Sequence, residues 1–98
     1  MSDPIKFTDL HQSALPYLPA ILQRILPGGK IVGREYLALN PRRADSRLGS
    51  FKINLMTGRW ADFAVRASGS DVTSLVAYLF GLSQTEAARR VMQMIGGV

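Results

Sequence analysis

A short alternating segment at the centre of the chain constrains the fold more than any other feature. Residues 50–55 switch between polar and apolar at every step. The apolar members are Phe51, Ile53 and Leu55. Because successive side chains of a β-strand point to opposite faces, this alternation predicts a strand with one buried side. Residues 56–58 then form a compact turn in which Gly58 suits a positive φ angle, so the sequence predicts a β-hairpin.

The returning strand of the hairpin spans residues 59–65, and its register decides which side chains face solvent. If Phe63 and Val65 join the core, their neighbours along the strand lie on the open face of the sheet. That face would carry Lys52, Asn54, Trp60 and Asp62. A bulge at the turn would shift the pairing by one residue and invert the assignment of the returning strand.

A further strand is predicted before the hairpin, over Lys30–Asn40. This stretch is rich in Ile, Val, Tyr and Leu and has no helical period. The Asn40-Pro41 pair breaks it, and residues 42–49 follow as a basic loop without apolar periodicity. Residues 67–70 are predicted to be a second loop. The result is a small antiparallel sheet of about three strands.

The N-terminal part of the chain is predicted to be helical. Apolar residues recur there at three- and four-residue spacing, which is one face of a helix. They are Leu10, Ala14, Leu18, Ile21, Leu22 and Ile25. Pro16 and Pro19 divide this stripe into helices near residues 9–15 and 18–26, because proline inside a helix removes a hydrogen bond but is tolerated in the first turn.

Two helices are predicted after residue 70. Ser70 or Asp71 caps the first helix, and Gly81 ends it. Its buried face is Val72, Leu75, Val76 and Leu79. Ser83 and Glu86 match a capping box, in which each side chain accepts from the other residue's backbone N–H group. The buried stripe of the last helix is Ala88, Val91, Met92 and Ile95.

The predicted fold class is therefore α+β, with an N-terminal helical segment and two C-terminal helices packed on one face of the sheet. The 98 residues suffice for one compact domain, with a helical lead-in at 1–29 and a sheet-bearing part at 30–98. No apolar run approaches the ~20 residues of a membrane span, and the N-terminus lacks the pattern of a signal peptide. The absence of cysteine fits a cytoplasmic protein, and we expect no membrane partner.

The positive charge of the chain is concentrated in its middle. Residues 30–66 hold eight basic residues against three acidic ones, which accounts for the whole net charge of +5. The basic residues are Lys30, Arg34, Arg42, Arg43, Arg47, Lys52, Arg59 and Arg66. Clustered positive charge of this kind suits a polyanion such as nucleic acid. The alternative is a solvated basic face that keeps the protein in solution.

The candidate nucleic-acid-binding residues are the basic and aromatic side chains of this region. Arg42, Arg43 and Arg47 share one loop, and guanidinium groups pair well with phosphate oxygens. Arg34, Lys52, Asn54, Arg59 and Arg66 would extend this surface. Trp60 is the best candidate for stacking on a base, and Tyr36 is a weaker one, although Trp60 could equally belong to the core. Asp62 is expected to hold Arg59 or Arg43 in place.

Six segments in order carry a family resemblance. They are 33–41 (Gly-Arg-Glu-Tyr-Leu-Ala-Leu-Asn-Pro), 49–51 (Gly-Ser-Phe), 58–63 (Gly-Arg-Trp-Ala-Asp-Phe), 69–75 (Gly-Ser-Asp-Val-Thr-Ser-Leu), 81–83 (Gly-Leu-Ser) and 86–88 (Glu-Ala-Ala). In this order and spacing they resemble the N-terminal zinc-ribbon domain of bacterial and phage DNA primases and of primase-helicase-like proteins. The resemblance spans about residues 33–95. It implies a domain without catalytic activity that engages a single-stranded template.

The chain departs from that family at the metal site. The family's four zinc-ligand positions fall on Asn40, Arg43, Asp62 and Val65. Zinc in such sites needs thiolate or imidazole donors, so we predict a degenerate domain with no metal and no other cofactor. Asn40 is expected to tie the loop through side-chain-to-backbone hydrogen bonds instead. The hydrophobic support would then come from the C-terminal helices together with Phe51, Trp60 and Phe63.

The sequence thus predicts a non-enzymatic nucleic-acid-binding module, with single-stranded DNA in phage or plasmid DNA replication as the leading ligand. Its partners would include a primase, helicase or polymerase. The alternative is a protein-interaction or inhibitory module that docks on a replication protein or another nucleic-acid enzyme. The sequence offers no nucleophile–base pair or phosphate-binding loop, and Asp45 with Asp62 is a poor candidate for a magnesium site.

Overall fold

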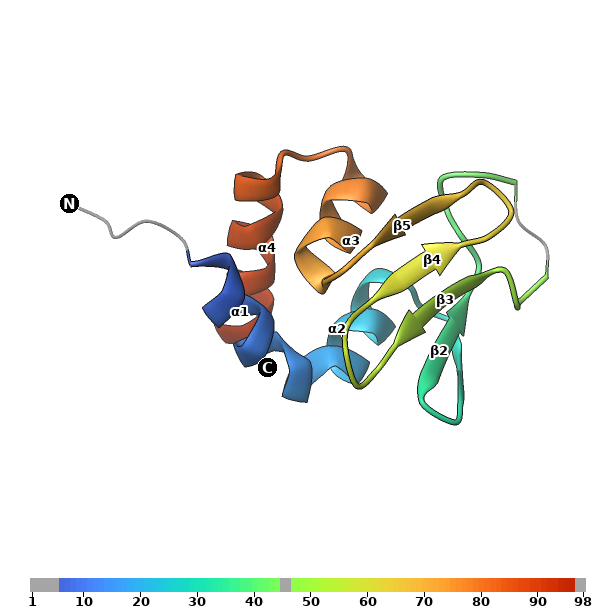
Figure 1. Ribbon diagram of the computed structural model, residues 1–98, viewed down its shortest axis with the longest axis horizontal. Helices are drawn as coiled ribbons and strands as arrows, with labels where there is room; N and C mark the ends of the chain where they lie inside the picture. The colour runs from blue at the N-terminus through green and yellow to red at the C-terminus, as the bar shows by residue number, and fades with distance from the viewer. Residues whose placement is uncertain (1–5, 45–46, 97–98) are drawn as a thin grey trace.

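The computed structural model describes residues 6–44 and 47–96, which form a sheet with helices against one face (Figure 1). The strands are β1 (Lys30–Val32), β2 (Glu35–Ala38), β3 (Phe51–Asn54), β4 (Trp60–Asp62) and β5 (Ala67–Gly69). Each strand pairs antiparallel with the next, in the order β1-β2-β3-β4-β5. The helices are α1 (Phe7–Ala14), the 3-10 turn η1 (Leu15–Tyr17), α2 (Leu18–Ile25), α3 (Val72–Phe80) and α4 (Gln84–Gly96). The α+β class is confirmed, with more strands than predicted.

The N-terminal helical segment follows the predicted division. Pro16 lies in η1, and Pro19 occupies the first turn of α2, where its missing N–H group costs nothing. Most of the predicted apolar stripe is buried in the core. The buried members are Leu10, Ala14, Leu18, Ile21 and Leu22, and Ile25 packs against them.

The single strand predicted over Lys30–Asn40 is wrong, because the chain reverses within it. Val32 pairs with Glu35, which leaves Gly33 and Arg34 as a two-residue hairpin turn. Gly33 has a φ angle of 61°, the left-handed conformation that glycine adopts without a steric penalty. Glycine in the first position is the preference of a type II′ hairpin turn. The turn therefore creates β1 and β2 from one apolar stretch.

The register of β3 and β4 corrects the first prediction for the returning strand and matches its alternative. Ile53 pairs with Trp60, and Phe51 pairs with Asp62. The backbone N–H of Asn54 donates to the carbonyl oxygen of Arg59, so the loop has four residues, 55–58, instead of the predicted three. That one extra residue inverts β4, because side chains alternate along a strand. Trp60 and Asp62 are buried, whereas Phe63 and Val65 are exposed.

The predicted loop at residues 67–70 contains a strand. Ala67–Gly69 forms β5, in which Trp60 pairs with Gly69 and Asp62 pairs with Ala67. Alanine, serine and glycine have low strand propensity, so this strand forms because β4 offers it an unpaired edge.

The two C-terminal helices have the predicted ends. The side chain of Asp71 accepts a hydrogen bond from the N–H group of Ser74 and caps α3, and Gly81 ends α3 with a φ angle of 66°. The capping box of α4 is formed, with Ser83 and Glu86 bonded reciprocally at 3.2 and 3.1 Å. The buried stripe of α4 differs slightly from the prediction, since Met94 is buried and Met92 is exposed.

The core lies between the helices and one face of the sheet. Its sheet residues include Tyr36, Ala38, Phe51, Ile53 and Trp60. No helix in the described part of the chain is long and apolar enough to cross a lipid bilayer.

Candidate nucleic-acid interface

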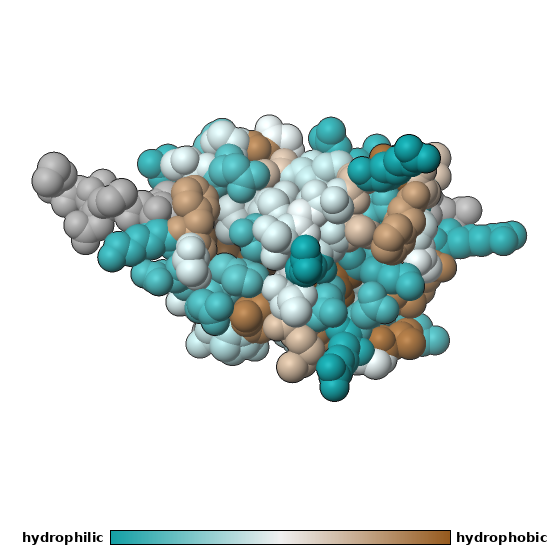
Figure 2. Space-filling view, viewed as in Figure 1, coloured by the Kyte–Doolittle hydropathy of each residue, from teal (hydrophilic) through white to brown (hydrophobic). Residues whose placement is uncertain are grey.

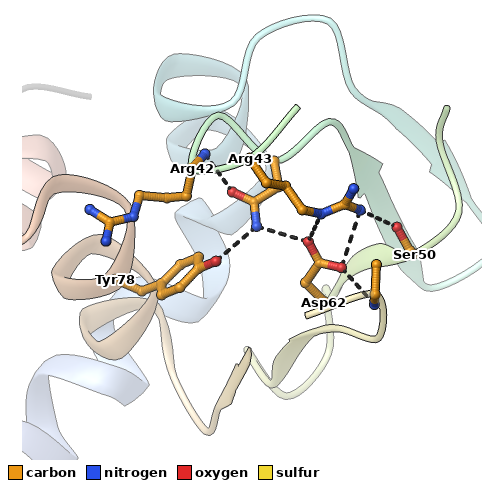
Figure 3. Close-up of polar contacts among 7 residues, drawn as sticks. Arg42, Arg43, Ser50, Asp62 and Tyr78 are labelled. Atoms are coloured by element: carbon orange, nitrogen blue, oxygen red, sulfur yellow. Dashed lines mark hydrogen bonds and ion pairs between the residues drawn. The ribbon is translucent and has the colours of Figure 1, made fainter. Parts of the chain in front are cut away.

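Two similar turns face each other at one end of the sheet, and they position most of the polar groups of the core face (Figure 3). In the first turn, Asn40 accepts from the N–H of Arg42 through Oδ1 at 2.8 Å and from the N–H of Arg43 through its carbonyl oxygen at 3.3 Å. In the second turn, Asp62 accepts from Ala64 through Oδ1 at 3.0 Å and from Val65 through its carbonyl oxygen at 3.3 Å. The backbone at 40–43 thus repeats the hydrogen-bond pattern at 62–65.

The side chains of the two turns bond to each other directly. Asn40 Nδ2 donates to Asp62 Oδ2 at 2.8 Å and to the hydroxyl of Tyr78 at 2.9 Å. Arg43 Nε donates to Asp62 Oδ2 at 2.7 Å, and Arg43 Nη2 donates to Asp62 Oδ1 at 3.2 Å and to the hydroxyl of Ser50. This polar cluster of Asn40, Arg43 and Asp62 therefore fastens the 39–50 loop to β4.

Asp62 is a structural carboxylate in this arrangement. Its side chain is fully buried, and burial by itself raises the pKa of a carboxyl group. The hydrogen bonds from Arg43, Asn40 and Ala64, with the charge of Arg43, outweigh that effect and lower the pKa below its usual value. The expectation that Asp62 holds Arg43 is confirmed. Asp45 lies outside the described residues, and no group of acidic or histidine side chains within 6–44 and 47–96 is placed to hold a metal ion.

The three loop arginines do not form the single phosphate-binding surface that the sequence predicted. Arg43 points inward onto Asp62, because a buried carboxylate needs a donor there. The guanidinium of Arg42 lies over the ring of Tyr78, 5.5 Å from its centroid, beside the end of α3 at Gly81. Both the aromatic face and the negative end of the helix dipole favour a cation at that place. Arg47 is exposed, and within residues 6–44 and 47–96 it has no ion pair or ring contact of this kind.

Both predicted stacking residues belong to the core. Trp60 is 5% exposed, its Nε1 donates to the hydroxyl of Ser74 at 2.9 Å, and its ring packs edge-on against Phe51. Tyr36 is 1% exposed and donates its hydroxyl to the carbonyl oxygen of Leu26 at 2.7 Å. Neither ring is available to a base, since the register places both on the helix-covered face.

The other face of the sheet is open and carries the remaining candidates. Residues that pair directly across strands share a face, so one row runs through Lys30, Leu37, Lys52, Ala61 and Ser68. A hollow of about 370 Å³ lies on this face, and the side chains of Lys52, Arg59 and Phe63 line it together with Glu35. The sequence predicted Lys52 on this face, whereas Arg59 was expected only as an extension of the basic surface. Phe63 was assigned to the core, but its ring is 69% exposed.

Of the three other predicted residues Arg34, Asn54 and Arg66, only Asn54 lines this hollow. Asn54 lines it, but its Oδ1 accepts from the N–H groups of Met56 and Thr57, so its side chain mainly shapes the β3–β4 turn. Arg34 lies in the β1–β2 turn and Arg66 in the β4–β5 turn, and both are exposed. Arg66 has a φ angle of 58°, which is uncommon for a residue with a side chain.

Figure 2 shows hydrophilic and neutral residues across the middle of the visible surface, with hydrophobic residues in separate spots. Long hydrophilic side chains project at the end where the 39–50 loop and the β4–β5 turn lie (Figures 1 and 2). A search against protein-family models and a search of curated proteins find no match to this chain.

Proposed function

We propose that this protein is a non-enzymatic module that binds single-stranded DNA on the open face of its sheet, in the replication of phage or plasmid DNA. The observation that carries the proposal is the hollow on that face, where the exposed ring of Phe63 lies with the cationic side chains of Lys52 and Arg59. Single strands are bound by this combination of an aromatic platform for bases and a basic surface for phosphates.

The charge of the open face supports a polyanionic ligand. Lys30 lies in the same cross-strand row as Lys52, and Glu35 is the one acidic residue that lines the hollow. Asp62, which would offset this charge, is held on the opposite face by Arg43. A sheet face with an exposed ring also suits unstacked bases better than a duplex, whose major groove accommodates a helix or a two-stranded ribbon.

The polar cluster supports the proposed kinship with primase zinc-ribbon domains, and the choice of DNA over RNA as ligand rests on that kinship alone. Three of the four positions that the resemblance assigns to zinc ligands, Asn40, Arg43 and Asp62, make direct contact in the cluster. The two turns that carry all four positions have the same hydrogen-bond pattern, as paired metal-binding turns would. We therefore propose that amide–carboxylate and guanidinium–carboxylate bonds join the turns where a metal joins them in the family.

Titration of a short fluorescein-labelled oligothymidine, followed by fluorescence anisotropy at several salt concentrations, tests the proposal. Affinity should fall with salt, with a log–log slope of about −0.7 for each phosphate neutralised. Lys52→Ala and Arg59→Ala should each weaken binding and reduce that slope by about 0.7. Phe63→Ala should weaken binding about tenfold and leave the slope unchanged, because a stacking contact releases no counterions.

Arg89→Ala serves as the matched control, since it removes one exposed positive charge from α4 on the helical side of the molecule. Its affinity and salt slope should equal those of the unmodified protein. Thermal melting verifies that every variant is folded. Absence of binding at low salt, or equal weakening by Arg89→Ala and Lys52→Ala, would overturn the proposal.

A further inference from the structure

A second hollow, distant from the open face, lies among three helices. It has a volume of about 350 Å³ and is bounded by residues of α2, α3 and α4. Its apolar part is formed by Ile25, Val76, Phe80 and Met94. Val76 and Met94 are almost fully buried, while the ring of Phe80 is 51% exposed. The hollow therefore combines a buried aliphatic base with a partly exposed aromatic wall, and this surface favours burial of an apolar side chain from outside.

The rim of this hollow is cationic. Arg24 of α2 and Arg90 of α4 line it and are exposed to solvent. Within residues 6–44 and 47–96, no carboxylate lies within ion-pair distance of either guanidinium. Glu86, one helical turn before Arg90, bonds to the N–H group of Ser83 in the capping box instead of pairing with Arg90. Two guanidinium groups thus flank an apolar recess without an acidic neighbour bound to them.

We propose that this hollow binds a short acidic peptide segment of a partner protein, which places one large apolar side chain against Val76 and Met94. Carboxylates on either side of that anchor pair with Arg24 and Arg90, because guanidinium groups offer only donors and bind carboxylates in a bidentate manner. This inference is independent of DNA binding, since none of these residues lies on the open face of the sheet.

The chemistry of the recess favours a peptide over a nucleic acid. Among the described residues, Phe80 is the only aromatic one that lines the recess, and the two cations flank a single recess instead of following a strand. The recess therefore lacks the row of aromatic and basic groups that binds a nucleic-acid strand. A peptide can place an apolar side chain and carboxylates within a few residues of one another, which matches the spacing of recess and rim on adjacent helices.

Fluorescence anisotropy with the labelled peptide Gly-Asp-Asp-Leu-Phe-Asp-Asp tests the proposal on the full chain. This peptide should bind. A version with asparagine in place of every aspartate, and a version with alanine in place of leucine and phenylalanine, should each bind at least about tenfold more weakly. Arg24→Glu and Arg90→Glu should each abolish binding, whereas Phe80→Ala should weaken it without loss of the folded state.

Arg89→Glu is the matched control, because it makes the same charge change at the neighbouring, exposed position of α4 outside the hollow. It should retain peptide binding. The proposal is overturned if the acidic peptide does not bind, if its neutral version binds equally well, or if Arg89→Glu weakens binding as much as Arg90→Glu. Competition by oligothymidine that depends on Arg24 and Arg90 would assign the hollow to nucleic acid instead.

Discussion

At the scale of single residues, Asp62 is the buried carboxylate of the polar cluster. It accepts hydrogen bonds from Arg43, Asn40 and the backbone of Ala64 while its side chain is fully buried. A buried carboxylate needs these donors, because its loss leaves buried donors without their acceptor, and the loss of a donor leaves a buried charge less well compensated.

Asp62→Asn should therefore lower the free energy of unfolding by about 3 kcal/mol, since the amide would place a donor against donors and remove the buried negative charge that Arg43 contacts. Ser50→Ala is the control, because it removes one hydrogen-bond partner of Arg43 and should cost about 1 kcal/mol. Urea unfolding at neutral pH measures the free energy of unfolding of both variants. Equal stability of Asp62→Asn and the unmodified protein would show that the cluster does not support the fold.

The pH dependence of stability follows from the direction of the pKa shift of Asp62. Its pKa is lower in the folded protein than the usual 3.8, so the folded state favours the ionised form. The stability from this group is complete above the unfolded pKa and is lost as pH falls through the folded pKa. The difference in stability between the unmodified protein and Asp62→Asn should accordingly shrink below about pH 4. Some acid dependence should remain in the variant, because hydrogen bonds from the backbone and side chain of Ser83 also lower the pKa of Glu86.

At the scale of elements, β5 depends on glycine for its contact with β4. A Cβ atom at Gly69 would overlap the hydroxyl of Ser74 and the Nε1 of Trp60, which bond to each other at 2.9 Å. The close approach of this strand to the indole therefore requires a residue without a side chain.

Gly69→Ala should destabilise the protein by about 1–3 kcal/mol through overpacking and should shift the emission of Trp60 to longer wavelength as its surroundings loosen. Ser68→Ala is the matched control, since Ser68 lies on the open face one residue earlier. The Ser68→Ala variant should change neither the stability of the protein nor the emission wavelength of Trp60. Unaltered stability and emission in Gly69→Ala would contradict the packing described for β5.

The helices were predictable from sequence, whereas the details of the sheet were not. Helix signals are local, so Asp71, Gly81 and the Ser83–Glu86 pair fixed the helix ends correctly. Strand pairing depends on distant residues. One additional loop residue after Asn54 exchanged the faces of Trp60 and Phe63, and Gly33 divided an apolar stretch that read as continuous.

The candidate site was predictable only in part for the same reason. Lys52 lies on the open face as expected, but Arg59 and Phe63 line the hollow with it only because the register differs from the first prediction. The alternative register predicted the exchange of faces between Trp60 and Phe63. No local sequence feature, however, distinguished the two registers. The inward orientation of Arg43 could be predicted only if Asp62 was known to be buried, and the burial of Asp62 follows from the same register.

At the scale of the whole molecule, the sheet separates two kinds of surface. One face contributes to the core that it shares with the helices, and the other presents the open-face hollow. The turns at 40–43 and 62–65 hold the end of the sheet together, and their matching hydrogen bonds allow a direct test of the proposed kinship with zinc-ribbon domains.

A variant with cysteine at Asn40, Arg43, Asp62 and Val65 should bind zinc or cobalt with four thiolates, because tetrahedral sites of this kind are built from two facing turns. Cobalt binding, read from the visible absorption of a tetrahedral thiolate complex, is the measurement. A control that retains Val65 should bind cobalt more weakly. If the variant with four cysteines gives no such absorption, the two turns are not placed as paired metal-binding turns.

The central claim is that the open face of the sheet is the surface that contacts single-stranded DNA. A map of backbone amide chemical shifts in isotope-labelled protein, recorded as oligothymidine is added, tests it most directly. The proposal predicts that the largest changes occur at Lys52, Arg59, Ala61, Phe63 and Ser68, with little change along α4. Changes confined to the helices, or spread evenly over all exposed cationic residues, would contradict it.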